Sequence, residues 1–143
     1  MNVKLEDLMP DVEMKPPYPA ADVDELISDF IAVVGPIPHP DYVDLIRRHA
    51  GGAGPIGTQN YLVLWPIDDV VLQTTIFEKT ARSSRLLLFA GDGGDTVFAF
   101  DRSDPSWPII SLPLTSASPE DRKSFAPTFS ELIKRLAADE SPL

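Results

Sequence analysis

The spacing of apolar and polar positions predicts helices near both ends of the chain and strands between them. Asp22 and Glu25 have the spacing of a capping box, so we expect a first helix to begin at Asp22. Apolar residues then recur every three or four positions, and Gly35-Pro36 ends that run. A second helix is expected at about 41–50. Thr128 and Glu131 have the spacing of a capping box, which predicts a C-terminal helix. Its buried face should carry Phe129, Leu132, Ile133 and Leu136.

Short apolar runs in the middle of the chain predict β-strands. They cover residues 61–65, 85–90, 95–101 and 107–112. The glycines of 91–94 permit a tight turn, so the second and third of these strands should form a β-hairpin. Because side chains alternate along a strand, Val97 and Ala99 should face one side of the sheet, and Phe98 and Phe100 the other.

The remaining segments are less regular. Asp68 or Asp69 could cap a helix over 70–81, whereas the β-branched residues at its start also suit a strand; we favour the helix. The Gly-Gly-Ala-Gly-Pro sequence at 51–55 predicts a flexible loop. A short helical turn is expected at 118–121.

The length of 143 residues suits one hydrophobic core. We divide the chain into a proline-rich N-terminal arm (1–20), one domain (21–138) and a short C-terminal tail (139–143). The arm should lead to the domain or pack on its surface without regular structure, because proline removes backbone donors. The order helix, helix, strands, helix predicts an α+β fold, with a twisted antiparallel sheet and helices packed against it.

The net charge of the chain bears on which classes of partner it can bind. Twelve basic and 22 acidic residues give a net charge of −10, which repels nucleic acid and anionic membranes. Such a charge either favours a basic protein partner or serves only to keep the protein in solution. The chain has no cysteine, which excludes disulfides and thiolate chemistry. Its first residues lack the apolar stretch of a secretory signal, and no apolar run is long enough to span a bilayer. We therefore expect a cytoplasmic protein.

The candidate chemical motifs are weak. His39 and His49 do not have the spacing of paired metal ligands, and we expect structural roles for both. The glycines at 91–94 lack the lysine and the following helix of a phosphate-binding loop. The acidic residues do not follow the order of a calcium-binding EF-hand loop. We therefore expect no catalytic residue, no cofactor and no metal site.

Five segments occur in an order that resembles the SUKH superfamily, over about residues 21–138. They are "IPHPDYVDLIRRHAGG", "YLVLWPIDDVV", "LLLFAGDGGDTVFAFD", "WPIISLPL" and "SPEDRKSFAPTFSELIKRL". Two turns depart from the family pattern, at Ala50, where asparagine is frequent, and at Asp95, where glycine or glutamate is frequent. The superfamily includes bacterial immunity proteins and a fungal cell-wall assembly regulator. The resemblance implies an α+β domain without catalytic machinery that binds and neutralises a cognate toxin, often a nuclease.

On this interpretation, acids in or beside turns would complement the basic cleft of the toxin. The predicted partner-binding residues are Asp68, Asp69, Asp92, Asp95, Asp101 and Asp104. The alternative for these six is that they are ordinary solvated turn acids. Two other functions remain open: a regulatory or scaffold module with no toxin partner, and a hydrolase that uses paired carboxylates in a cleft.

Overall fold

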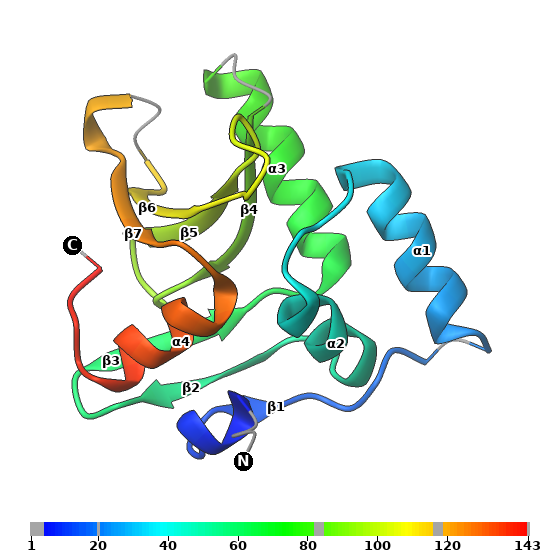
Figure 1. The fold of residues 1–143 in the computed structure, drawn as a ribbon, viewed down its shortest axis with the longest axis horizontal. Helices are drawn as coiled ribbons and strands as arrows, with labels where there is room; N and C mark the ends of the chain where they lie inside the picture. Colours follow the sequence, from blue (N-terminus) through cyan, green and yellow to red (C-terminus); the bar gives the residue numbers. More distant parts are fainter. Residues whose placement is uncertain (1–4, 20, 82–84, 116–118, 143) are drawn as a thin grey trace.

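The chain forms a seven-stranded antiparallel sheet whose strands lie side by side in chain order (Figure 1). The structure is a computed structural model that describes residues 5–19, 21–81, 85–115 and 119–142. The strands are β1 (Glu13–Met14), β2 (Gly52–Ile56), β3 (Asn60–Leu64), β4 (Leu86–Gly91), β5 (Thr96–Asp101), β6 (Ile109–Pro113) and β7 (Lys123–Ala126). The helices are α1 (Val23–Val34), α2 (Pro40–Arg48), α3 (Ile67–Ala81) and α4 (Phe129–Ala137), with 3₁₀ segments η1 (Leu5–Leu8) and η2 (Pro119–Asp121). The predicted α+β class is confirmed.

The two faces of β5 belong to different hydrophobic clusters, as the alternation predicted. Phe98 and Phe100 are buried in the main core, whereas Val97 and Ala99 are buried in a second cluster on the other face. The main core is formed with side chains from α1, α2 and α4. At its centre the rings of Phe89 and Phe100 stack with centroids 4.0 Å apart. Tyr42 of α2 packs edge-on against both rings, and Phe129 of α4 packs against Phe89, so aromatic contacts join these two helices to the sheet.

The predicted helix starts at both ends of the chain are confirmed. The Asp22 carboxylate accepts a hydrogen bond from the backbone N–H of Glu25 at 3.0 Å, at the start of α1. The Thr128 hydroxyl accepts one from the N–H of Glu131 at 3.2 Å, at the start of α4. Each of these bonds satisfies a backbone donor that the helix itself leaves without a partner.

The helical interpretation of 70–81 is also confirmed, but its predicted cap is wrong. α3 begins at Ile67, so Asp68 and Asp69 lie inside its first turn. The N–H of Ile67 donates instead to the Tyr18 hydroxyl, at 2.9 Å. A residue far away in the sequence therefore supplies the acceptor, which local spacing does not reveal.

The predicted loop at 51–55 is wrong, because Gly52–Ile56 form β2 and pair in full with β3. A Cβ at Gly52 would lie 2.8 Å from the carbonyl oxygen of Glu13, and one at Gly54 would overlap the carbonyl of Asp11. The glycines therefore let the N-terminal arm pack directly on this strand. Glycine usually weakens a strand, but here it allows the backbone of the N-terminal arm to approach closely.

The N-terminal arm contains regular structure, contrary to the expectation. It forms η1, and β1 pairs with β2 through Glu13↔Ala53. Met9 and Val12 are buried in the main core. The arm therefore adds an edge strand and apolar contacts to the domain on which it packs.

Near the β7 edge of the sheet, the structure differs from the expectation in the start of one strand and in the presence of another. β6 begins at Ile109, because the backbone of Trp107 has φ +50° and is not extended. β7 was not predicted, because the short, polar sequence Lys-Ser-Phe-Ala carries little strand signal. Within the predicted turn at 118–121, Ser118 lies outside the described residues and Pro119–Asp121 form η2.

Candidate partner-binding surface

Asp92 and Asp95 lie in the turn between β4 and β5. Oδ1 of Asp92 accepts hydrogen bonds from the backbone N–H of Gly94 at 2.8 Å and of Thr96 at 3.2 Å. Gly93 has φ +83° and packs against the ring of Tyr61, where a Cβ would come within 3.0 Å of a ring carbon. The Asp92 carboxylate thus stabilises the turn, whereas the side chain of Asp95 is exposed.

Asp101 and Asp104 organise the loop between β5 and β6. Oδ1 of Asp101 accepts a hydrogen bond from the N–H of Ser103 at 3.0 Å. Oδ1 of Asp104 accepts from the N–H of Ser106 at 2.9 Å and from its hydroxyl at 2.7 Å. These bonds lower the pKa of Asp104, because they favour the charged carboxylate. Each carboxylate therefore stabilises its own loop through an Asx turn, in which the side chain accepts a hydrogen bond from the N–H two residues later.

The six predicted acids do not form one cluster. Asp95 and Asp101 lie at opposite ends of β5. A six-residue strand rise separates them by about 20 Å. The turn of Asp92 and Asp95 and the loop of Asp101 and Asp104 are therefore two separate places on the surface.

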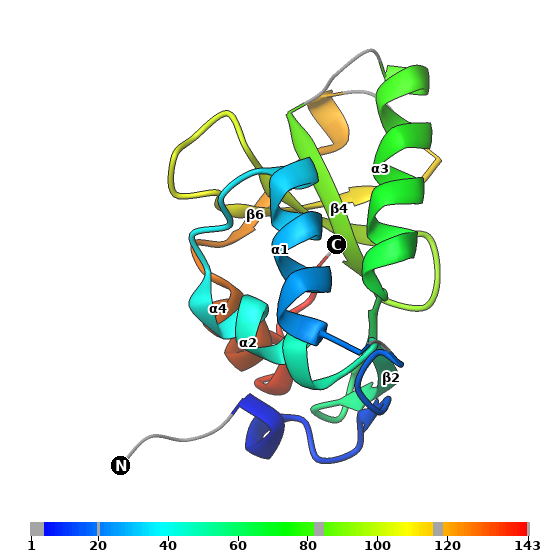
Figure 2. The same cartoon turned by 90° about the vertical axis from the view of Figure 1, so that its right-hand side faces the viewer.

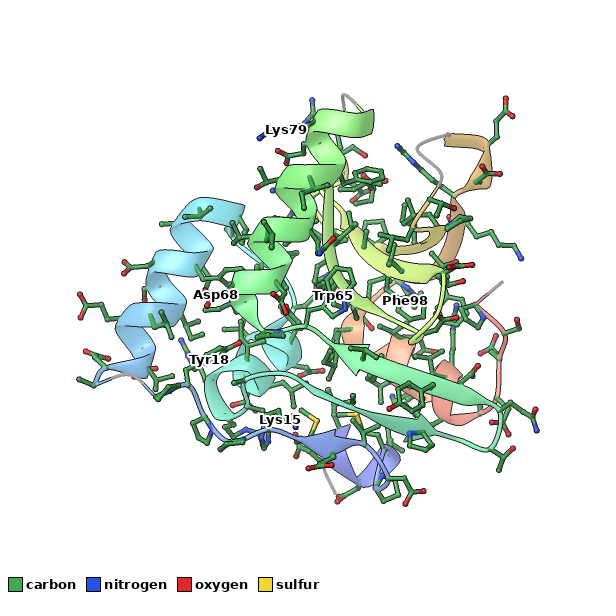
Figure 3. The ribbon with its side chains drawn as sticks, turned by 180° about the vertical axis from the view of Figure 1, so that it is seen from behind. Lys15, Tyr18, Trp65, Asp68, Lys79 and Phe98 are labelled. Carbon is green, nitrogen blue, oxygen red and sulfur yellow. The ribbon has the colours of Figure 1, made fainter. Side chains whose placement is uncertain are left out.

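Asp68 and Asp69 differ from the other acids in their surroundings. Both are exposed, and within the described residues no hydrogen bond or ion pair reaches either carboxylate. Figure 3 shows Asp68 and Tyr18 at one end of α3 and Lys79 at the other. Burial raises the pKa of Tyr18, the Ile67 hydrogen bond opposes this, and the negative charges of Asp68 and Asp69 add to the rise. These two carboxylates are thus available to an external partner.

The outer side of α3 carries an apolar pair that sequence reasoning missed. The helix buries Ile67, Val70, Thr74 and Phe77 at spacings of three and four residues. On the opposite side, Leu72 is 53% exposed and Ile76 is 49% exposed, one turn apart. The sequence would have revealed this pair only if the buried side of the helix had been known, because Leu72 and Ile76 lie on the side opposite to it.

α1 lies beside α3, as Figures 1 and 2 show. The Arg102 guanidinium links the two helices: Nη1 donates to the carbonyl of Val34 at 3.0 Å, and Nη2 to Glu78 at 3.3 Å. Val33, next to this link, is 70% exposed. We call the exposed sides of both helices the α1–α3 face. It consists of Asp24, Glu25, Asp29, Val33, Asp68, Asp69, Leu72 and Ile76.

The α1–α3 face is acidic. The two helices carry six acidic side chains against one lysine, which accounts for half of the net charge of −10. Asp24 forms an ion pair with Arg47 at 3.4 Å. An acidic surface with an apolar centre suits a protein partner of the opposite charge.

Both histidines have the structural roles that we predicted. His39 is buried; its Nδ1 accepts the N–H of Phe129 at 3.4 Å, so Nε2 carries the proton and donates to the carbonyl of Trp107 at 2.8 Å. Nδ1 of His49 lies 2.8 Å from the carbonyl oxygen of Lys15 and holds the N-terminal arm. Across the described ranges, no group of three His, Asp or Glu side chains is arranged to hold a metal ion.

A small apolar recess lies beneath the arm, beside the buried hydroxyl of Tyr42. That hydroxyl has no hydrogen-bond partner in the described part of the chain, and burial raises the pKa of Tyr42. The recess has a cavity volume of only about 10 Å³, and Met14, His49 and Trp65 border it. Small-molecule sites usually measure roughly 300–1,000 Å³. The recess is therefore a weaker functional candidate than the helical surface.

The comparison with protein families identifies the fold. The model of the SMI1 / KNR4 family (SUKH-1) matches residues 25–135, from the start of α1 to α4. No curated protein sequence matches the chain significantly. Among the described helices, none is long and apolar enough to cross a membrane. Because the family match covers most of the chain and every helix of the main core, the chain belongs to the SMI1 / KNR4 (SUKH-1) family.

Proposed function

We propose that this protein is an immunity protein that binds a cognate protein toxin and blocks it without catalysis. The family match over residues 25–135 carries the proposal, because membership of the SUKH-1 family is consistent with an immunity-type role. The family is generally non-catalytic, and the two histidines are already engaged in structural hydrogen bonds.

The charge supports a toxin with a basic active-site cleft, such as a nuclease. A nuclease binds phosphates with lysine and arginine side chains, which creates a positive potential. A protein of net charge −10 is attracted to such a cleft and can cover it. Electrostatic attraction mainly raises the association rate, while the tightness of binding depends on the buried contacts.

Co-expression tests the proposal. The toxin domain encoded by the neighbouring reading frame is expressed alone, with this protein, and with an unrelated acidic protein of similar size as control. We expect growth to be restored by this protein only, and the two chains to elute together in size-exclusion chromatography. Unchanged killing together with separate elution would refute the immunity role.

A regulatory or scaffold role without a toxin partner predicts a different result. Affinity purification would then recover cellular proteins that are unrelated to any toxin. Turnover of a substrate by the purified protein, lost on substitution of a single side chain, would instead support a hydrolase and contradict the non-catalytic mechanism.

A further inference from the structure

We propose that the α1–α3 face is the docking surface for a basic partner that packs an apolar side chain against Leu72 and Ile76. The inference rests on the proposed function only in naming the toxin as the natural partner. It differs from the expectation that turn acids bind, because Asp92, Asp101 and Asp104 use their carboxylates within their own turns.

The first argument is the location of exposed apolar side chains. Five large hydrophobic residues are exposed in the part of the chain that the structure describes, and three of them, Val33, Leu72 and Ile76, lie on α1 and α3. Single exposed apolar residues are ordinary on protein surfaces, whereas a group on adjacent elements is typical of an interaction site.

These residues are not needed for the core. α3 already packs inward through Ile67, Val70 and Phe77, and Leu72 lies on the opposite side of the helix. α1 likewise packs inward through Ile27 and Phe30, whereas Val33 points to solvent. Folding therefore gives no reason for the outward apolar side chains, but burial by a partner would contribute about 25 cal/mol per Å².

The second argument is charge, which determines the chemistry of the occupant. Asp68 and Asp69 occupy the first turn of α3, one turn before Leu72. The acids of α1, Asp24, Glu25 and Asp29, lie within its first seven residues. Acidic groups therefore border the apolar residues, so the complementary surface carries lysine or arginine around an apolar side chain.

The third argument is rigidity. Tyr18 holds the first turn of α3 through Ile67, and Arg102 joins the C-terminal end of α1 to Glu78 of α3. A surface whose elements are already fixed loses little conformational entropy on binding, which favours affinity.

The experiment uses the full chain and two partners: the toxin domain of the neighbouring reading frame, and a synthetic amphipathic peptide of lysine and leucine. Hydrogen–deuterium exchange with each partner locates the protected amides, and calorimetry gives the affinity. We expect protection of α1 and α3 in both cases. Protection on another face, or no binding of either partner, overturns the inference.

Matched variants separate local contacts from overall charge. The double variant D68N/D69N should weaken binding about threefold to tenfold at low salt, since each ion pair at a rim is worth a few tenths to about 1 kcal/mol. D7N/D11N removes the same charge from the N-terminal arm, where both acids are exposed, and should change binding less than about twofold. An equal loss in the two variants would mean that net charge acts without a specific site.

The apolar contacts are tested in the same way. L72S/I76S should weaken binding about tenfold or more, because buried apolar anchors at an interface centre carry most of its energy. L114S changes a leucine that is 45% exposed beside the β4–β5 turn and should leave affinity unchanged. A greater loss with L114S would place the interface at that turn and overturn the inference.

The outcomes also distinguish this inference from the proposed function. Peptide protection on α1 and α3 without toxin neutralisation would retain the docking surface and reject the immunity role. Toxin neutralisation with amide protection confined to the β4–β5 turn would support the immunity role and reject the α1–α3 face as the docking surface. Circular dichroism of each variant checks that the fold is intact, which is expected because every substituted side chain is exposed.

Discussion

The imidazole of His39 lies with Nε2 2.8 Å from the carbonyl oxygen of Trp107, 68 positions further along the chain. Its other nitrogen accepts the first N–H of α4, from Phe129, at 3.4 Å. The ring also stacks on Phe100 with centroids 4.8 Å apart. One buried side chain therefore joins the start of α2, the loop before β6 and the start of α4.

Replacing His39 should be among the most destabilising single changes. H39A removes both hydrogen bonds and leaves a buried cavity, so we expect the free energy of unfolding to fall by about 2–4 kcal/mol. Urea denaturation followed by circular dichroism measures the change. H49A serves as the comparison, because His49 is only half-buried and makes one hydrogen bond, to Lys15. A larger loss for H49A than for H39A would contradict this role.

Thr74 covers a part of β4 that is not paired with β3. Its hydroxyl accepts the N–H of Leu88 at 3.0 Å and donates to the carbonyl of the same residue at 3.4 Å. T74V keeps the shape but leaves these buried backbone groups without a partner, so we expect a loss of about 1–3 kcal/mol in unfolding free energy. T75V is the matched control, because Thr75 is exposed and bonds only within its own helix. Similar losses in both would show that this part of β4 does not depend on Thr74.

Tyr18 should link the stability of α3 to alkaline pH. Y18F removes the acceptor of the Ile67 N–H and should cost about 0.5–1.5 kcal/mol of unfolding free energy at neutral pH. The pKa of Tyr18 is raised above its ordinary value of 10.0, chiefly by burial. The stability that comes from burying the neutral Tyr18 side chain is therefore complete below the unfolded-state pKa. It is lost as the pH rises through the higher native pKa. Denaturation between about pH 8 and 11 should show a shallower decline for Y18F than for the wild type, and parallel curves would argue against the link.

Asp139 should link stability to acidic pH. Its carboxylate accepts hydrogen bonds from the hydroxyl and N–H of Thr58 and from the N–H of Gln59, which lower its pKa. This contribution is present above the unfolded-state pKa and is lost as the pH falls through the lower native pKa. D139N should lose stability less steeply than the wild type between about pH 5 and 2. Asparagine tolerates the φ of +66° at this position, so the backbone is retained. D11N removes an exposed acid of the arm and serves as the control for the loss of one negative charge.

The structure also explains which features of the fold were predictable. The caps at Asp22 and Thr128 and the two-sided strand at 97–100 were predicted correctly, because each depends on residues within a few positions. β2 and β7 were missed because their local composition opposes or barely favours a strand. They form because a neighbouring strand provides the hydrogen bonds, and in β2 because the glycines admit the N-terminal arm.

For the candidate site, the sequence by itself determined the net charge, the number of acids and the turns in which many of them lie. Only the tertiary structure decided that Asp95 and Asp101 lie at opposite ends of one strand, that Leu72 is exposed, and that its helix α3 lies beside α1. The physical reason is the range of the interactions. Caps, turns and alternation are set by neighbours in the chain. The position of α3 depends on its buried side chains and on Tyr18 and Arg102, whose contacts come from distant segments of the chain.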